Sequence, residues 1–228
     1  PDPLAASNKT GLTTVPLVSS EELQPFVDSL KSVPKSGLHN PLKNVNRYVQ
    51  YGEISHKAGE ALADDKIQDY FAKVIMRCMP KSYVQCRTEV AVTAAFLKNF
   101  SGDNVRFLCG NSFEVSGDHD GQVSRGYRWP YGPVGIIAPF NFPLEIPVLQ
   151  LMGALFMGNK PFLKSTEKVS FVMEAFVRLL IDCGMDPKDV DILNCEGPIA
   201  SELIERGGVR VTQFTGSSQV AELLCEQT

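Results

Sequence analysis

The sequence lacks the residue spacings that mark zinc sites and disulfide frameworks. Its six cysteines are scattered and none form a C-x-x-C pair, while the three histidines, His39, His56 and His119, lie far apart along the chain. We therefore expect no metal site. A chain of 228 residues with cysteines so dispersed is typical of a reduced intracellular protein.

The chain also lacks an excess of basic charge and a long apolar run. It carries 22 Lys and Arg against 26 Asp and Glu, a net charge of −4, which argues against nucleic-acid binding. The most apolar stretch, Leu149–Phe162, is interrupted by Gly153, Gly158, Asn159 and Lys160, so we expect no membrane-spanning segment. The first residue is not Met, so we expect a processed or trimmed N-terminus, and any upstream targeting segment would not be visible.

Glycine-rich phosphate-binding motifs are missing as well. There is no G-x-G-x-x-G, and the Walker pattern fails because Leu163 precedes Lys164. A dinucleotide would have to be held in another way. The segment Phe214–Ser218 joins a predicted strand to a predicted helix, where free N–H groups and the helix dipole favour an anion. Ser217 could also cap that helix, and the two roles are compatible.

A strand, a helix and a second strand follow one another in the middle of the chain. Val134–Ala138 is an apolar run without polar alternation, which is typical of a strand buried on both faces. Leu144–Met157 is too long for one strand, and Gly158 and Asn159 are expected to end it as a helix. Pro161–Lys164 restarts the strand pattern, so the stretch predicts a βαβ crossover.

The same alternation continues to the last residue, which predicts an α/β fold with a doubly wound parallel sheet. The expected helices are 169–183, 198–206 and 217–225, and the expected strands are 190–193 and 209–214. Residues 112–127 predict a β-hairpin. Apolar residues at helical spacing predict helices over 48–100, whose charges we interpret as solvated helix faces. Before them lies an arm with one short helix over 20–30.

Asn141 follows the first predicted strand, and Lys164 to Glu167 follow the second. In open α/β sheets, ligands bind beyond the carboxyl ends of the strands. The Asn141 amide could stabilise an oxyanion with its N–H donors. It could also cap the helix that begins near Pro143. The spacing alone favours the cap, because such start signals are common.

Three motifs in order resemble the aldehyde dehydrogenase superfamily. Pro139–Pro143 (PFNFP) and Phe162–Glu167 (FLKSTE) resemble that family's PWNFP and LKPSE signature, and Phe214–Ser218 resembles its FTGS segment. The amino-acid sequences of segments 139–159 and 128–133 are most similar to those of the plant-type pyrroline-5-carboxylate dehydrogenases. The resemblance implies the Rossmann-like cofactor domain of this family, with residues 1–111 as its N-terminal arm and helices, 112–128 as a bridging hairpin and 129–228 as its βα units.

The resemblance also implies roles for individual residues. Asn141 matches the side chain that helps to hold the thiohemiacetal oxygen, and Phe142 matches a wall of the aldehyde channel. Lys164 and Glu167 match residues at the adenosine ribose, where a carboxylate favours NAD over NADP. Ser217 matches a pyrophosphate contact. The implied contacts with NAD are Ala138, Pro139, Phe140, Lys164, Glu167, Gly197, Phe214, Gly216, Ser217 and Val220.

These roles imply the N-terminal, cofactor-binding half of an NAD-dependent aldehyde dehydrogenase that oxidises L-glutamate 5-semialdehyde to glutamate in proline catabolism. In the family, the nucleophilic Cys and the basic Glu lie downstream of FTGS, so we expect neither within these 228 residues. The implied partners are a small aldehyde and further copies of the chain, in a dimer or larger homo-oligomer. The implied location is the mitochondrial matrix, with the cytoplasm as the alternative. A non-catalytic α/β module that binds a nucleotide or a partner chain is the alternative function.

Overall fold

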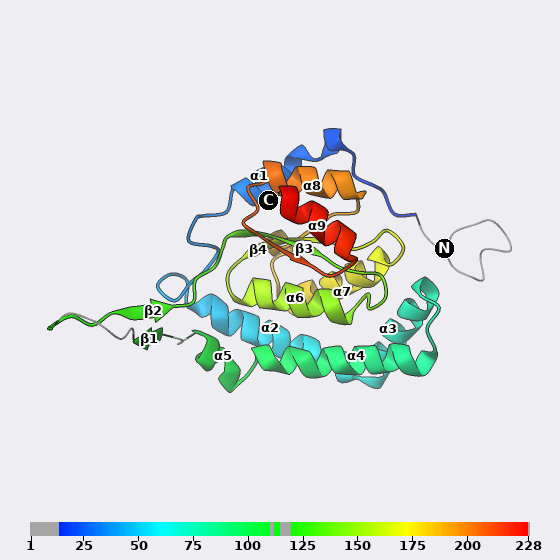
Figure 1. The fold of residues 1–228 in the computed structure, drawn as a ribbon. Coiled ribbons are helices and arrows are strands. Elements are labelled where there is room, and N and C mark those ends of the chain that lie inside the picture. Colours follow the sequence, from blue (N-terminus) through cyan, green and yellow to red (C-terminus); the bar gives the residue numbers. More distant parts are fainter. Residues whose placement is uncertain (1–13, 110–111, 115–119, 228) are drawn as a thin grey trace.

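A four-stranded parallel sheet forms the centre of the computed structural model, which describes residues 14–109, 112–114 and 120–227 (Figure 1). The strand order is β5-β4-β3-β6. The strands are β3 (Pro133–Ile137), β4 (Lys160–Lys164), β5 (Asp191–Ile192) and β6 (Val211–Phe214). The chain moves outward from β3 to β5 and then returns to place β6 on the other side of β3. The doubly wound parallel sheet is therefore confirmed, and its topological switch point lies between β3 and β6.

The helices lie close to the positions that periodicity predicts. The α-helices are α1 (Gln24–Lys31), α2 (Asn46–Ala63), α3 (Asp65–Cys78), α4 (Tyr83–Leu97), α5 (Asp103–Cys109), α6 (Glu145–Phe156), α7 (Ser170–Asp182), α8 (Gly197–Arg206) and α9 (Ser218–Gln227). Short 3-10 turns are η2 (Ser20–Glu22), η3 (Lys98–Phe100) and η4 (Pro187–Asp189). The sequence did not predict α5, a helix of seven residues with no buried position.

Helices cover both faces of the sheet, which therefore separates two apolar cores. One core lies among α2, α3, α4, α6 and α7, and the other lies among α1, α8 and α9 (Figure 1). Adjacent residues of a strand point to opposite faces. Phe162 accordingly packs into the core with α1 and α8, while Leu163 packs into the core with α6 and α7. This two-sided burial explains why the strands are apolar without alternation.

Glycine is required at two positions of the βαβ unit. A Cβ on Gly135 would lie 2.9 Å from Cε1 of Phe162, so glycine lets that ring lie against β3. Gly158 has φ +84°, and its N–H donates to the carbonyl of Leu155 at 3.0 Å. A side chain there would also collide with the backbone oxygen of His39, 2.0 Å from the Cβ position. The predicted end of the central helix is therefore confirmed. Glycine is needed there both for the backbone conformation and for the close contact with His39.

The predicted hairpin is present as β1 (Ser112–Glu114) and β2 (Arg125–Tyr127), which pair antiparallel with Phe113 opposite Gly126. Most of its predicted turn, 117–121, lies outside the described residues. In Figure 1 the two strands project from one side of the body, away from the sheet. The bridging role that the resemblance implies for this hairpin stays a prediction.

A buried polar network ties α2 to the rest of the fold. The Asp189 carboxylate accepts hydrogen bonds from the Tyr51 hydroxyl at 2.5 Å and from Nη2 of Arg47 at 2.9 Å. Nε2 of His39 bonds the carbonyl of Phe156 at 2.7 Å, and Nε of Arg47 donates to Nδ1 of His39 at 3.3 Å. These contacts assign neutral His39 with its proton on Nε2. Burial lowers the pKa of His39.

We predict that this network makes stability depend on pH below neutrality. The pKa of His39 is lower in the folded state than its ordinary value near 6.5, so the unfolded chain binds the proton more readily. The free energy of unfolding should therefore fall as the pH drops below about 6.5. Urea titrations at several pH values should show a shallower fall for His39→Gln, which keeps an N–H donor but cannot charge. The exposed His56→Gln is the matched control, and equal slopes for wild type and His39→Gln would contradict the prediction.

Candidate functional site

Three loops leave the sheet side by side at the carboxyl ends of β4, β3 and β6. Ile137 of β3 pairs with Lys164 on one side and with Phe214 on the other. The backbone N–H of Ala138 donates to the carbonyl of Lys164 at 3.0 Å, and that of Thr215 donates to the carbonyl of Ile137 at 3.0 Å. Because the strands are parallel, the three loops start at the same edge. All three resembling motifs therefore lie together.

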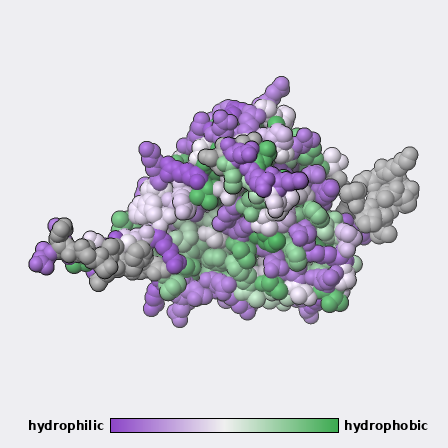
Figure 2. Space-filling model, in the orientation of Figure 1, coloured by the Kyte–Doolittle hydropathy of each residue, from purple (hydrophilic) through white to green (hydrophobic). Residues whose placement is uncertain are grey.

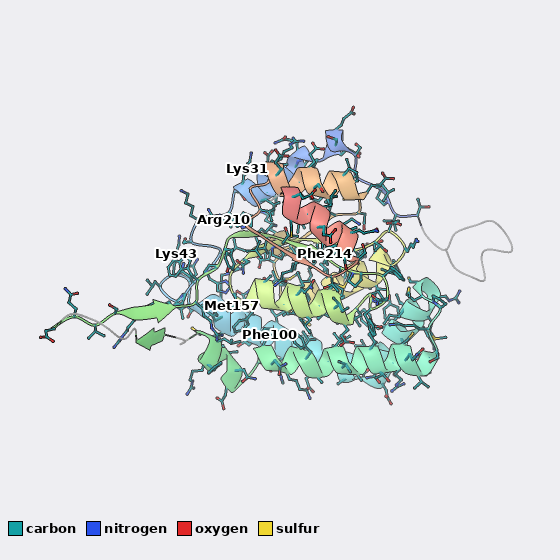
Figure 3. All side chains as sticks on the ribbon, viewed as in Figure 1. Lys31, Lys43, Phe100, Met157, Arg210 and Phe214 are labelled. Carbon is teal, nitrogen blue, oxygen red and sulfur yellow. The ribbon has the colours of Figure 1, made fainter. Side chains whose placement is uncertain are left out.

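The start of α6 lies at this same edge. Figure 3 places Arg210 and Phe214 at opposite ends of β6, with Phe214 on the side where α6 begins and Met157 beyond the far end of α6. Nε2 of Gln150 on α6 donates to Oγ1 of Thr215 at 2.9 Å. This bond spans the switch point between β3 and β6, where ligands of doubly wound sheets bind.

The structure shows that Asn141 does not cap α6, so the interpretation favoured by spacing alone is wrong. The helix begins at Glu145, and its N-cap position is Leu144. Oε1 of Glu89, from α4, accepts from the backbone N–H groups of Leu144 at 2.9 Å and Glu145 at 3.3 Å. Asn141 is exposed, and its amide has no hydrogen-bond partner among the described residues. Its two N–H donors are therefore available to a ligand.

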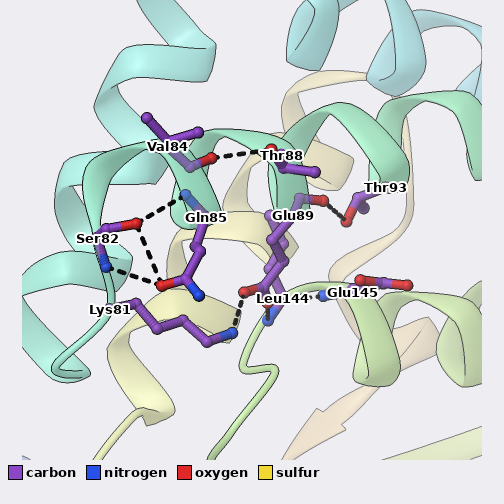
Figure 4. Close-up of polar contacts among 9 residues, drawn as sticks. All are labelled: Lys81, Ser82, Val84, Gln85, Thr88, Glu89, Thr93, Leu144 and Glu145. Carbon is purple, nitrogen blue, oxygen red and sulfur yellow. Dashed lines mark hydrogen bonds and ion pairs between the residues drawn. The ribbon is translucent and has the colours of Figure 1, made fainter.

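The carboxylate of Glu89 belongs to a small ionic cluster at the start of α6 (Figure 4). The Glu89 side chain is 1% exposed, and its Oε2 accepts from Nζ of Lys81 at 2.9 Å. The same Nζ lies 3.8 Å from the ring centroid of Phe142, the residue after Asn141. Burial, followed by the nearby Glu89 charge, raises the pKa of Glu145. The interpretation of charges in this half as solvated faces is therefore wrong for Glu89.

A sequence signal for Glu89 did exist. The buried positions of α4 recur at helical spacing, and they are Cys86, Glu89, Val90, Thr93, Ala94 and Leu97. Glu89 thus lies on the apolar face, where an unpaired carboxylate would be costly. A charged residue at such a position indicates a buried partner, although the sequence does not say which one.

The predicted cofactor contacts converge on this edge, with different degrees of burial. Ala138 is buried, and the half-buried residues are Pro139, Lys164 and Phe214. The exposed ones are Phe140, Glu167, Gly197, Gly216, Ser217 and Val220. Phe142, predicted to line the aldehyde channel, is 40% exposed. The structure brings these residues to one edge, and their individual roles stay predictions.

The surface around this edge includes exposed apolar side chains. Phe140 is 53% exposed, and on neighbouring helices Leu149 and Val220 are each 43% exposed. Figure 2 shows apolar side chains gathered over the region of α6 in the same view. Exposed apolar patches commonly mark binding surfaces, which fits an edge that receives a ligand or further protein.

The turn into α9 has the form of an anion site. Ser217 precedes the helix, and the N–H of Val220 donates to its Oγ at 3.5 Å, the outer limit of a hydrogen bond. The first-turn N–H groups are therefore only weakly satisfied by the cap. A Cβ on Gly216 would lie 2.5 Å from Cζ of the Phe214 ring. Glycine at this position avoids that contact and lets the turn lie close to the Phe214 ring.

Several buried polar atoms near the carboxyl ends of the strands have no partner in the described part of the chain. They are Oγ of Ser165, Oγ1 of Thr166, Oε1 of Gln150 and Oδ1 of Asn194. Buried polar atoms are nearly always hydrogen-bonded to protein or water. Their gathering here fits an edge that holds a polar ligand, as a dinucleotide would be.

The cysteine nearest this edge is poorly suited to nucleophilic chemistry. Cys195 is 1% exposed, and burial raises the pKa of its thiol to about 11, while the nearby Lys164 partly opposes the shift. A thiol acts as a nucleophile only as the thiolate. Within residues 14–109, 112–114 and 120–227, no cluster of His, Cys, Asp and Glu could hold a metal ion. None of the helices described is long and apolar enough to cross a bilayer.

Comparisons with known proteins agree with the resemblance seen in the sequence. The sequence profile of the aldehyde dehydrogenase family matches residues 43–228. The chain is 57% identical to a mitochondrial delta-1-pyrroline-5-carboxylate dehydrogenase of Arabidopsis thaliana and 56% identical to a probable aldehyde dehydrogenase of Linum usitatissimum, each over 207 residues. Both matches cover 91% of this chain and 37% of the relative. The chain therefore spans little more than a third of these relatives' length.

A solved structure shares the fold. The succinic semialdehyde dehydrogenase of Streptococcus pyogenes, in complex with NADP+, superimposes with a TM-score of 0.81 at 18% identity. The match covers 95% of this chain and 45% of that chain. At this identity the likeness establishes the fold alone.

We predict that Cys195 resists alkylation in the folded protein. A rise in pKa from 9.0 to about 11 should lower the thiolate fraction at pH 8 by about a hundredfold, and burial restricts access further. Mass spectrometry after brief iodoacetamide treatment should find Cys225, which is exposed, modified and Cys195 protected. Urea should abolish the protection. Equally fast modification of both residues in the folded protein would show that Cys195 is accessible and reactive.

Proposed function

Because the chain belongs to the aldehyde dehydrogenase family, we propose that it forms the cofactor-binding portion of an NAD-dependent aldehyde dehydrogenase. The observation that carries this proposal is the convergence of three loops at the switch point of the sheet. They follow β3 with Asn141, β4 with Lys164 and Glu167, and β6 with Ser217. The loop after β3 offers amide donors, the loop after β4 offers a cation and a carboxylate, and the loop after β6 leads into a helix N-terminus. Together these groups can bind a dinucleotide and an aldehyde.

We propose L-glutamate 5-semialdehyde as the aldehyde and glutamate as the product, in proline catabolism. The support is the identity of 57% to the Arabidopsis thaliana relative, whose name states delta-1-pyrroline-5-carboxylate dehydrogenase activity and a mitochondrial location. We accordingly propose the mitochondrial matrix as the location. The proposed homo-oligomer, a dimer or larger, rests on the hairpin of β1 and β2, which projects from the body (Figure 1).

In the proposed mechanism, Asn141 stabilises the oxyanion that forms when a thiolate attacks the aldehyde carbon. The exposed amide has no competing partner among the described residues, so its donors can be aimed at developing negative charge. Phe142 would form a wall beside the aldehyde. The nucleophilic Cys and the basic Glu are proposed to come from outside these 228 residues, since the family carries both downstream of FTGS and none of the six cysteines lies in a matching motif.

The residues present fit a dinucleotide held along the edge of the sheet. When bound, the nicotinamide would accept a hydride from the substrate. Lys164 and Glu167 would contact the adenosine ribose, and Gly197 would begin the turn over the adenine. Ser217 and the first-turn N–H groups of α9 would hold the pyrophosphate. The Glu167 carboxylate is the feature that favours NAD, since a 2′-phosphate would meet like charge.

We predict that Asn141→Ala lowers turnover of glutamate semialdehyde by the full-length enzyme about a hundredfold or more, as loss of one oxyanion donor does. The assay is NADH formation at saturating NAD, with thermal unfolding to confirm the fold. Asn46→Ala is the matched control, since Asn46 is exposed on α2. Unchanged turnover would show that Asn141 does not stabilise the oxyanion. NAD binding without any aldehyde-dependent NADH formation in wild type would favour a non-catalytic nucleotide-binding module.

We predict that Glu167→Gln shifts cofactor preference toward NADP. Two unit charges about 4 Å apart repel by roughly 1 kcal/mol even in water, so removing one should raise the ratio of kcat/KM for NADP to that for NAD about fivefold or more. The exposed Glu205→Gln on α8, away from the strand ends, serves as the control. An unchanged ratio would show that Glu167 does not face the ribose.

A further inference from the structure

We propose that Glu89 is a positioning residue for Asn141, acting through the first turn of α6. This inference rests on the proposed function, because it concerns how the oxyanion donor is held. Glu89 lies on α4, in the N-terminal helices that precede the sheet, and the resembling motifs do not include it. Its buried carboxylate accepts from the backbone N–H of Leu144 at the start of α6, three residues after Asn141 (Figure 4).

The first step of the argument is that α6 cannot cap itself. Its N-cap position is Leu144, an apolar residue, and no side chain at that position accepts from the first turn. Oε1 of Glu89 accepts from the N–H of Leu144 at 2.9 Å and from that of Glu145 at 3.3 Å. A carboxylate is also the charge that the positive end of a helix dipole favours. Glu89 therefore determines where α6 starts and how the preceding chain enters it.

The second step is that the same cluster holds Phe142. Nζ of Lys81 donates to Oε2 of Glu89 at 2.9 Å and lies 3.8 Å from the Phe142 ring centroid. The Lys81 side chain is 16% exposed, so the pair is largely withdrawn from water. A cation over the face of an aromatic ring is attracted to that ring by a cation–π interaction. Glu89 thus orients Lys81, and Lys81 in turn restrains the residue next to Asn141.

The third step is that the Asn141 loop is short and is held at both ends. On the β3 side, the N–H of Ala138 donates to the carbonyl of Lys164 at 3.0 Å. On the α6 side, Pro143 is buried and has a fixed φ, and Leu144 is bonded to Glu89. The Asn141 amide makes no bond of its own within the described residues. The backbone that carries this amide is therefore positioned by these two anchors, of which Glu89 is one.

The test is a double-mutant cycle in the full-length enzyme with Glu89→Gln and Asn141→Ala. Glutamine keeps the size of the side chain but loses the charge that binds Lys81 and the helix terminus. We expect Glu89→Gln to lower kcat about tenfold in the presence of Asn141, since small displacements of a reacting group cost as much as a hundredfold. In the Asn141→Ala background the same change should lower kcat by less than about twofold, because groups that act together are not additive.

Glu89→Ala removes the cap altogether and should lower kcat further than Glu89→Gln. In the Asn141→Ala background, Glu89→Ala should also have little effect on kcat. If Glu89→Ala does not fold, Glu89→Gln alone decides. KM for NAD should change less than kcat, because only Ala138, Pro139 and Phe140 among the predicted cofactor contacts lie in the Asn141 loop. The matched control is Asp64→Ala, which removes a carboxylate that caps α3 through the N–H groups of Lys66 and Ile67. It should lower thermal stability without a change in kcat.

The inference is overturned if Glu89→Gln leaves kcat unchanged, or if it lowers kcat by the same factor with and without Asn141. Either result would leave Glu89 with a structural role only. Failure of the proposed function gives a different pattern. In that case Asn141→Ala itself has no effect, or the wild-type enzyme forms no NADH with glutamate semialdehyde.

Discussion

The parallel pairing of β3 with β4 on one side and β6 on the other is the constraint on which the site depends. Ile137 is opposite both Lys164 and Phe214, so the residues that follow these three positions leave the sheet together. Their side chains come from segments far apart in sequence, yet the ladder hydrogen bonds fix their relative places. Burial of the strands on both faces makes this register hard to change, because a slip would move apolar side chains between the cores. The sheet thus positions the loops that carry the candidate site.

Local patterns were sufficient where local physics decides the structure. Gly158 ends α6 because it adopts a left-handed φ of +84°, and glycine after an apolar helical run is a reliable stop signal. The apolar runs that became β3 and β4 were recognisable because both faces of the sheet are covered. The same pattern predicted that the polar residues after β3 and β4 lie at one edge of the sheet, and the strand order places them there. Their roles, which the resemblance implies, stay predictions.

Long-range contacts account for what the sequence did not reveal. Asn141 looked like a helix cap because Asn before a helix usually is one, but the cap comes from Glu89, 55 residues before Leu144 in sequence. The local sequence around Asn141 does not predict a contact with Glu89. Likewise, the bonds among His39, Arg47, Tyr51 and Asp189 join segments separated by up to 142 positions. Once Glu89 supplies the cap, the Asn141 amide is left without an internal partner, which is the state that an oxyanion donor requires.

The central claim is that the loops after β3, β4 and β6 form one crevice for a dinucleotide and an aldehyde. A crystal structure of the full-length protein with NAD bound tests it most directly. The predicted result places the adenosine ribose against Lys164 and Glu167, the pyrophosphate at Ser217 and the N-terminus of α9, and the Asn141 amide facing the same crevice. A dinucleotide bound away from these loops, or an Asn141 amide directed toward the opposite edge of the sheet, would contradict it.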